Sequence, residues 1–189
     1  MSATDLIAPY NREVWVLTAA ADGRRGGLVT TFVCEASIVP ELPRVLVGIA
    51  KQHYTWQLIE ASNAFALHLL GEDHLDWVWR FGLRSGRDID KLAGLATTAG
   101  TTGSPILTDA LAWIDCRVEA RMDIGDRTVY LAEQVSAKLL RSDPCLTARR
   151  MLQLAPPERK RELADQMQRD IATDGAAIRA WRATHHEQR

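Results

Sequence analysis

Apolar and polar residues alternate most regularly between Ile114 and Asp123. The apolar members are Ile114, Cys116, Val118, Ala120 and Met122, and Asp115, Arg117, Glu119, Arg121 and Asp123 stand between them. Side chains two positions apart share one face of a strand, so this pattern predicts a strand of an antiparallel sheet with one face buried. Gly125-Asp126 then supplies a hairpin turn before a returning strand over 127–140. We expect Cys116 to be a small core residue on the buried face.

Four further apolar runs rich in β-branched residues predict strands. They span residues 14–20, 28–33, 44–50 and 64–70. Asp22-Gly23 is a turn signal, Gly26-Gly27 a flexible connection, and Pro40 and Pro43 bracket a loop. The strands show no regular alternation with helices. A closed antiparallel barrel is the simplest arrangement, because closure removes exposed sheet edges.

Helical spacing appears between the strands and at the end of the chain. We expect short helices over 55–62 and 73–81, and another beginning at Asp143-Pro144. A further helix follows Pro156-Pro157, with Leu163, Met167 and Ile171 at every fourth position and a break at Asp174-Gly175. We therefore expect a β domain over 1–142 and a helical extension over 143–189. The apolar stripe of the extension must pack on the barrel or on a second subunit.

Composition is that of an ordinary folded domain. Of 189 residues, 47% are hydrophobic and 25% charged, and 23 Lys and Arg against 24 Asp and Glu leave a net charge of −1. Without a basic excess we expect no nucleic-acid partner. The apolar runs are much shorter than the roughly 20 residues that span a bilayer. Residues 1–10 lack a signal-peptide pattern. We expect a soluble, cytoplasmic protein with no membrane contact.

Familiar catalytic and metal motifs are absent from the sequence. There is no GxGxxG after a strand, no Walker loop, no GxSxG and no HExxH. Three scattered cysteines without a CxxC argue against a disulfide framework or a zinc site. The histidines do not share metal-ligand spacing. We therefore expect no metal, and neither hydrolase nor nuclease chemistry is supported.

Two polar segments stand out in this apolar frame. Lys51 to Thr55 lies between a buried strand and a helix start, where backbone N–H groups, the Thr55 hydroxyl and Lys51 could bind a phosphate. The alternative is that Thr55 is a plain N-cap and Lys51 a solvated loop residue. The loop 84–91 concentrates Arg84, Arg87 and Lys91. Such charge runs also occur on solvated faces.

The order of these segments, over about residues 14–135, resembles the flavin reductase-like proteins, which have an FMN-binding split barrel. The matching segments are Gly27 to Phe32, Pro40 to Pro43, Val45 to Ala50, Lys51 to Thr55, Phe65 to Leu70, Trp77 to Phe81, Arg87 to Lys91, Gly103 to Leu107 and Gly125-Asp126. The resemblance implies a mainly β, antiparallel split barrel of Greek-key type, with short helices between strands. The C-terminal helical extension is additional to the minimal fold.

The resemblance also implies a set of site residues, which we carry over position by position. Thr30, Thr31, Phe32 and Val33 would line the isoalloxazine ring. Ala50, Lys51, Gln52, His53, Tyr54 and Thr55 would approach the ribityl chain and phosphate. Arg87 and Lys91 would neutralise the phosphate, either within one subunit or from the neighbouring subunit of a homodimer. Tyr54, Trp56 and Phe81 would contact the ring or belong to the core. Asp126 and Arg127 would border the nicotinamide.

The function implied is that of an FMN-dependent NAD(P)H oxidoreductase. Hydride would pass from the nicotinamide to flavin N5 and on to a small acceptor or a partner monooxygenase, with FAD or riboflavin as alternative flavin substrates. No catalytic side chain is expected, because the flavin carries the chemistry. Three departures matter: Arg127 replaces the usual His after Gly-Asp, His68 replaces the usual Asn, and Pro40-Glu41-Leu42-Pro43 replaces the common Asp-Pro-Pro. The alternative is a split-barrel protein that binds flavin, haem or deazaflavin as an electron carrier or docking module, or a dimeric interaction protein with an empty pocket.

Overall fold

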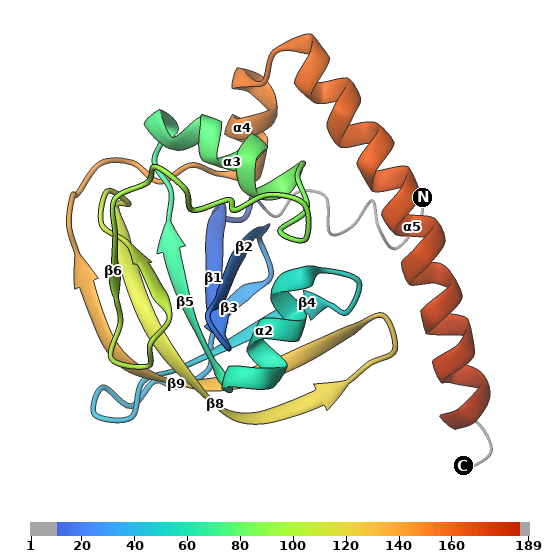
Figure 1. Ribbon diagram of the computed structural model, residues 1–189, viewed down its shortest axis with the longest axis horizontal. Helices are drawn as coiled ribbons and strands as arrows, with labels where there is room; N and C mark the ends of the chain where they lie inside the picture. The colour runs from blue at the N-terminus through green and yellow to red at the C-terminus, as the bar shows by residue number, and fades with distance from the viewer. Residues whose placement is uncertain (1–10, 186–189) are drawn as a thin grey trace.

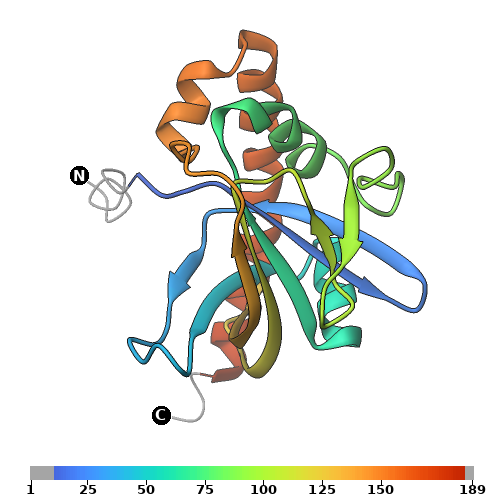
Figure 2. The same ribbon diagram turned by 90° about the vertical axis from the view of Figure 1, so that its left-hand side faces the viewer.

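The computed structural model describes residues 11–185, and its centre is a strongly curved antiparallel sheet (Figures 1 and 2). Seven strands lie in the order β2-β1-β5-β8-β9-β4-β3. Their bounds are β1 Trp15–Ala21, β2 Arg24–Thr30, β3 Val33–Glu35, β4 Arg44–Ala50, β5 Ala64–Leu69, β8 Ala112–Asp123 and β9 Arg127–Leu139. A separate two-stranded sheet pairs β6 (Thr97–Ala99) with β7 (Pro105–Leu107). The predicted antiparallel β architecture is confirmed.

The barrel is split rather than closed. β2 and β3 are the two edges of the sheet, and in the part of the chain that the structure describes no ladder joins them. Only Thr31 and Phe32 connect these strands along the chain. The edges therefore diverge from a shared corner, which leaves an opening between them.

Strand positions follow the sequence pattern closely, with one correction in the edge strand β2. β4 has the predicted bounds, and the turn at Asp22-Gly23 is confirmed by positive φ angles at both residues. Gly26 and Gly27, expected in a flexible connection, instead lie inside β2. A Cβ at Gly27 would come within 2.9 Å of Phe81 and of the Leu17 carbonyl, so the strand needs glycine there for close packing.

The strict alternation expected in β8 is wrong. Asp115 and Cys116 are both fully buried, whereas Ala120 and Met122, expected inside, are exposed. Register shifts at Asp115/Cys116 and at Val118/Ala120 rotate the strand partway along. Asp115 accepts hydrogen bonds from the backbone and hydroxyl of Thr102, which satisfies its buried carboxylate. Cys116 is a core residue, as predicted.

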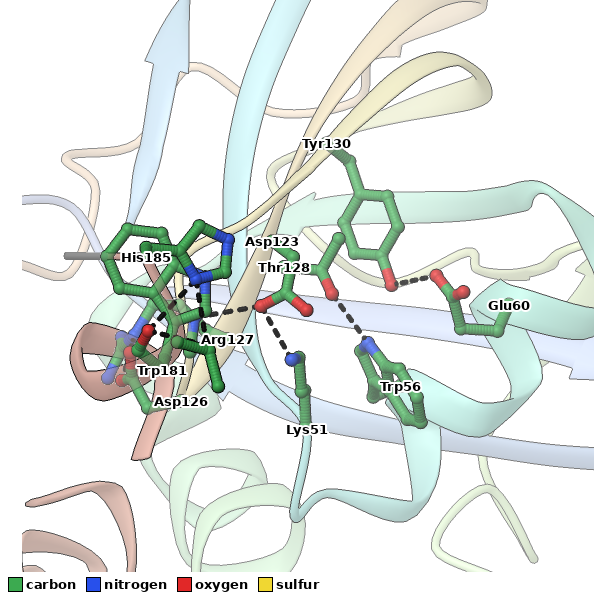
Figure 3. A network of polar contacts seen from close by, with 12 residues as sticks. Lys51, Trp56, Glu60, Asp123, Asp126, Arg127, Thr128, Tyr130, Trp181 and His185 are labelled. Carbon is green, nitrogen blue, oxygen red and sulfur yellow. Dashed lines mark hydrogen bonds and ion pairs between the residues drawn. The ribbon is translucent and has the colours of Figure 1, made fainter. Parts of the chain in front are cut away.

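Short helices cover the sheet. α2 (Tyr54–Ser62) packs against the core inside the curve of the sheet, and α3 (Leu75–Gly82) follows the short 3-10 helix η1 (Glu72–His74). Trp56 Nε1 donates to Thr128 Oγ1 over 3.0 Å, and the Tyr130 hydroxyl donates to Glu60 over 2.7 Å (Figure 3). These two hydrogen bonds fix α2 against β9.

The C-terminal helices differ from the sequence expectation in their bounds. α4 spans Ala148–Leu154 with Thr147 as N-cap, so the predicted start at Asp143-Pro144 is wrong. α5 runs without a break over Pro157–His185, through the expected stop at Asp174-Gly175. An interior glycine costs a helix only about 1 kcal/mol, which 29 residues of hydrogen bonding outweigh. α5 extends along one side of the barrel and none of its residues is fully buried (Figure 1).

Two apolar clusters form the core. The first lies between the sheet and α2 and includes Leu17, Val47, Phe65, Cys116 and Tyr130. The second packs α3 and α4 on β1 and β5, and includes Val16, Leu70, Trp79, Phe81 and Leu146. Leu163 is the residue through which α5 reaches the second cluster. α5 therefore packs loosely on the barrel, which leaves room for cavities between the two.

His68 is buried in the middle of β5 and is held as a neutral ring. Its Nε2 accepts from the Leu107 N–H over 3.0 Å, so Nδ1 carries the proton and donates to the Val16 carbonyl over 3.1 Å. Complete burial lowers the pKa of His68 from 6.5 to about 4, with the hydrogen bond to Val16 opposing the shift. His68 thus replaces the expected Asn as a connector between three strands.

We predict that His68 makes the protein lose stability in mild acid. The unfolded state takes up the proton below pH 6.5 but the native state only near pH 4, so the free energy of unfolding falls through this window by about 3 kcal/mol. Urea denaturation at several pH values tests this. His68→Gln should flatten the profile relative to the exposed control His185→Gln. Equal slopes in the two variants would contradict the prediction.

A second prediction concerns Gly48 in β4. The Phe32 ring lies directly on this glycine, and a Cβ there would overlap the ring carbons. Gly48→Ala should cost about 1–3 kcal/mol through overpacking. Adding Phe32→Ala should recover part of that loss, because the clash is then removed. Gly82→Ala, where the nearest contact would be an ordinary 3.5 Å to Val29, is the control. Additive losses in the Gly48→Ala/Phe32→Ala pair by urea denaturation would refute this packing.

Candidate functional site

Three cavities meet where β4 gives way to α2. We call them the polar cavity (about 330 Å³), the strand-edge cavity (about 410 Å³) and the apolar cavity (about 610 Å³). His53 and Asp170 line all three, so the cavities form one continuous site. Barrel, α2 and α3 form one side of this site, and α5 forms the other.

The polar cavity lies at the N-terminus of α2. His53 is the N-cap residue, with extended backbone and no side-chain cap, so the first N–H groups of the helix have no capping side chain. Thr55 is the second helical residue and is buried, so the reading of Thr55 as N-cap is wrong. The loop after α3 brings Arg84 and Arg87 to the same cavity. Asp88 and Asp170 also line this cavity, but Arg84, Arg87 and Lys91 outnumber them. Backbone N–H groups and the excess of cations together favour an anion here.

Arg87 and Lys91 are held differently at this cavity. The Arg87 guanidinium donates to the Gln52 carbonyl over 3.2 Å and lies 5.8 Å from the Tyr54 ring centroid. Lys91 is only 4% exposed, and its ammonium donates to the carbonyls of Gly27 (3.0 Å) and Phe81 (2.7 Å). Burial lowers the pKa of Lys91 from 10.5 to about 8. Lys91 therefore ties the loop to β2 and α3 while adding positive charge to the cavity wall.

The strand-edge cavity lies at the opening between β2 and β3. It is lined by Thr30, Thr31 and Phe32 on one side and by Gly48, Ile49 and Ala50 on the other. The Thr30 hydroxyl accepts from the Phe32 N–H over 3.1 Å, which fixes the corner between the two strands. Gln52, His53, Arg127, Met167, Asp170 and Asp174 complete the lining. The opening between the two strand segments could accommodate a flat ring.

The β8–β9 turn is fastened to the start of α2. The Lys51 ammonium lies 2.6 Å from Asp123 Oδ1, which also accepts from the Gly125 N–H over 2.8 Å (Figure 3). The Lys51 N–H donates to the Asp126 carbonyl over 2.9 Å. Asp123 has its pKa lowered, chiefly by the hydrogen bond from Lys51. Lys51 therefore holds the turn in place, and its side chain does not line the three cavities.

Arg127 and Gln52 connect the barrel to α5. Arg127 contacts Asp126 over 2.6 Å and Asp174 over 3.2 Å. The Gln52 amide donates to Asp170 (3.2 Å) and Asp174 (3.1 Å). Burial raises the pKa of Asp174, with Arg127 opposing the shift. The Gln52 amide and the Arg127 guanidinium are therefore both hydrogen-bonded to carboxylates of α5.

His53 lies at the junction of the cavities. Burial lowers its pKa, and Asp170 opposes the shift. The ring is therefore largely neutral at pH 7 and adds no full positive charge to the site.

The sequence-derived site residues divide into those around the cavities and those elsewhere. Gln52, His53, Tyr54, Thr55, Arg87 and Lys91 line the polar cavity, and Thr30, Thr31, Phe32 and Ala50 the strand-edge cavity. Asp126 and Arg127 line the apolar cavity. Val33, Lys51 and Phe81 line none of the three. Phe81 is buried in the second core cluster.

Sequence reasoning missed the contribution of α5. Gln166, Asp170 and Asp174 all line the site, together with Met167 and Ile171. The signal was present, because the three polar residues recur every four positions beside the apolar stripe. This spacing could not be interpreted from the sequence alone, because the sequence does not show that α5 lies against the opening between β2 and β3.

Residues 11–185 contain neither a metal-binding cluster nor a membrane-spanning helix. Within that range no group of three or more His, Cys, Asp or Glu side chains is placed to hold a metal ion. No helix in this range combines the length and apolar character needed to cross a membrane.

Known proteins resemble this chain in sequence. The sequence profile of the flavin reductase like domain matches residues 7–154. The reductase subunit HsaB of a flavin-dependent monooxygenase from Rhodococcus jostii is 36% identical over 132 residues, which cover 69% of this chain and 64% of that protein. The chain spans less than a quarter of three cyanobacterial diflavin flavoproteins that it also matches.

Solved structures share the fold. Nitrilotriacetate monooxygenase component B from Mycobacterium thermoresistibile superposes with a TM-score of 0.67 at 28% identity, covering 75% of this chain and 78% of that one. An FMN-binding protein from Thermus thermophilus superposes with a TM-score of 0.64 at 22% identity, covering 69% and 73% of the two chains. The profile match extends over most of the sequence and includes every strand of the split barrel. This chain therefore belongs to the flavin reductase-like domain family.

Proposed function

We propose that the protein binds FMN in the continuous site and uses NAD(P)H to reduce it, for transfer of electrons to an acceptor or a partner monooxygenase. The observation that carries the proposal is the union of two cavities of complementary character. A cation-lined cavity at a helix N-terminus adjoins a flat cavity at a strand edge. A phosphate joined to a planar ring by a short chain has the same two-part character.

The polar cavity supplies what a phosphate dianion requires. The first N–H groups of α2 point toward the cavity end of the helix, and Arg84, Arg87 and Lys91 add positive charge. Charge-assisted hydrogen bonds from such groups are stronger than neutral ones. Arg87 is oriented beforehand by Gln52 and Tyr54, so little side-chain freedom is lost on binding.

The strand-edge cavity supplies a place for the ring. Thr30, Thr31 and Phe32 on one wall and Ala50 on the other would border it and exclude water from its faces. A bound flavin supplies the redox chemistry by accepting hydride from a reduced nicotinamide and passing two electrons onward. The protein contributes binding and orientation. Asp126 and Arg127 would border the nicotinamide from the apolar cavity.

A second candidate function is flavin binding without nicotinamide turnover, as an electron carrier or docking module. The observation in its favour is Arg127, which stands where the family usually has His. Its guanidinium is bound by Asp126 and Asp174 rather than free for a substrate. A haem or deazaflavin in the same site is distinguished by the visible spectrum of the purified protein.

A protein partner and a homodimeric assembly belong to the proposal. The names of the Rhodococcus and Mycobacterium proteins describe components of monooxygenases, which supports a monooxygenase partner here. A homodimer is supported by large apolar side chains exposed on the β3–β4 connection, Ile38, Val39 and Leu42. A cytoplasmic location stays a prediction from the sequence.

We predict that the polar cavity makes the protein prefer FMN to riboflavin. Fluorescence titration should give the tighter Kd for FMN. Arg87→Gln should weaken FMN binding about tenfold and leave riboflavin binding within about twofold, since one charge-assisted contact is lost. Arg24→Gln, an exposed residue of β2 outside the cavities, is the matched control. Equal weakening of both flavins would place the phosphate elsewhere.

We also predict that purified protein with FMN oxidises NADH or NADPH under nitrogen until the flavin is reduced. Absorbance at the flavin and nicotinamide bands follows both reactants, and the two changes should be equal in moles. Protein that binds FMN tightly but leaves the nicotinamide unchanged would exclude the reductase and favour the carrier function. Absence of any flavin binding would exclude both.

A further inference from the structure

The apolar cavity between α5 and the barrel has the size and lining of a small-molecule site. Its volume of about 610 Å³ lies within the range of roughly 300–1,000 Å³ typical of such sites. Its apolar walls come from four elements. Val29 belongs to β2, Val78 to α3, Met151 to α4, and Met167, Ile171 and Ile178 to α5.

The apolar side chains of α5 remain partly open to this cavity. Met167 is 62% exposed and Ile171 57%, although both line the cavity wall. α5 has no fully buried residue, so its apolar face gains little from packing on the barrel. An apolar ring in the cavity would remove these side chains from water.

The charges around the cavity are predominantly negative. Asp126, Asp170 and Asp174 line it, and Arg127 is the cation beside them. The guanidinium of Arg127 already contacts both Asp126 and Asp174. The Asp126 and Asp174 side chains are only 5% and 19% exposed, so water screens them weakly. An anionic ligand would meet repulsion without a free cation.

Ionised carboxylates accept hydrogen bonds but donate none. Asp170 accepts hydrogen bonds from Gln52 and Gln166, and Asp174 from Gln52 and Arg127. These bonds use only some of the roughly four acceptor positions of each carboxylate. A ligand with an N–H or O–H group can use the remaining positions. A ligand with a carboxylate can not.

We propose that the apolar cavity binds an uncharged ring compound carrying an amide or hydroxyl donor, and that Asp170 and Asp174 exclude its carboxylate analogue. The two aspartates are thus specificity-determining residues supplied by the C-terminal helix. The role of the bound ring in electron transfer rests on the proposed function, whereas its binding does not.

An isosteric pair of fluorescent probes tests the proposal on the full-length protein, both without flavin and saturated with FMN. We expect 2-naphthamide to bind and 2-naphthoate to bind at least tenfold more weakly. In Asp170→Asn/Asp174→Asn the two affinities should come within about threefold, because two of the three carboxylates lose their charge and Arg127 keeps only its contact with Asp126. Asp165→Asn lies on the same helix but outside the cavity, and should keep the wild-type ratio.

A cavity-filling variant tests the location. Met167→Trp should weaken 2-naphthamide binding at least tenfold, whereas Leu152→Trp, an exposed residue of α4 outside the cavity, should not. Thermal denaturation followed by circular dichroism checks that each variant is folded. If the double variant is unfolded, Asp170→Asn alone should still measurably lower the ratio of the Kd for 2-naphthoate to the Kd for 2-naphthamide.

Several outcomes would overturn the proposal. They are equal binding of the two probes, a ratio unchanged in the folded aspartate variants, or naphthamide binding insensitive to Met167→Trp. Protein that binds FMN but not naphthamide would refute this inference and leave the proposed function standing. Selective naphthamide binding by protein that fails to bind FMN would support this inference and refute the proposed function.

Discussion

The whole site depends on the failure of the sheet to close between β2 and β3. Closing a sheet satisfies the backbone hydrogen bonds of both edges. Here the two edge strands are joined by only Thr31 and Phe32, and the Phe32 ring occupies the surface of Gly48 on the neighbouring strand. The corner turns β3 back onto β4 and away from β2. The resulting opening is the strand-edge cavity, and α2 begins beside it.

The electrostatics follow from which elements border this opening. On the barrel side, the N-terminus of α2 and the loop after α3 contribute positive charge. On the opposite side, α5 contributes Asp170 and Asp174. The two sides meet at Gln52 and Arg127, whose contacts with these carboxylates attach α5. Asp170 also lines the polar cavity, but cations outnumber carboxylates there, whereas carboxylates outnumber cations in the apolar cavity. The site is therefore polarised, with an end suited to an anion and an end that disfavours one.

The antiparallel sheet and most strand bounds could be predicted from the sequence, because each strand carries its own pattern of apolar residues. β8 shows the limit of such reasoning. Its alternation is perfect in the sequence, yet two register shifts and the buried Asp115–Thr102 contact change which side chains face inward. Likewise, Gly175 looks like a helix stop but is outweighed by the rest of α5. Bulges and long helices depend on contacts with distant residues, which a local sequence pattern does not show.

Site residues were harder to predict for the same reason. Gln52, His53 and Arg87 could be expected at one site because the resemblance gave their positions as a set. All three line the polar cavity. Lys51 was expected beside a phosphate, but it pairs with Asp123, a residue 72 positions later in the chain. The aspartates of α5 could not be assigned at all, since nothing local in the sequence indicates which surface a helix covers.

A crystal structure of the protein with FMN tests the central claim most directly. The account predicts the phosphate at the N-terminus of α2, within hydrogen-bond distance of Arg87, and the ring between Thr30–Phe32 and Ala50. Density for FMN at another surface, or a phosphate turned toward the aspartates of α5, would contradict it.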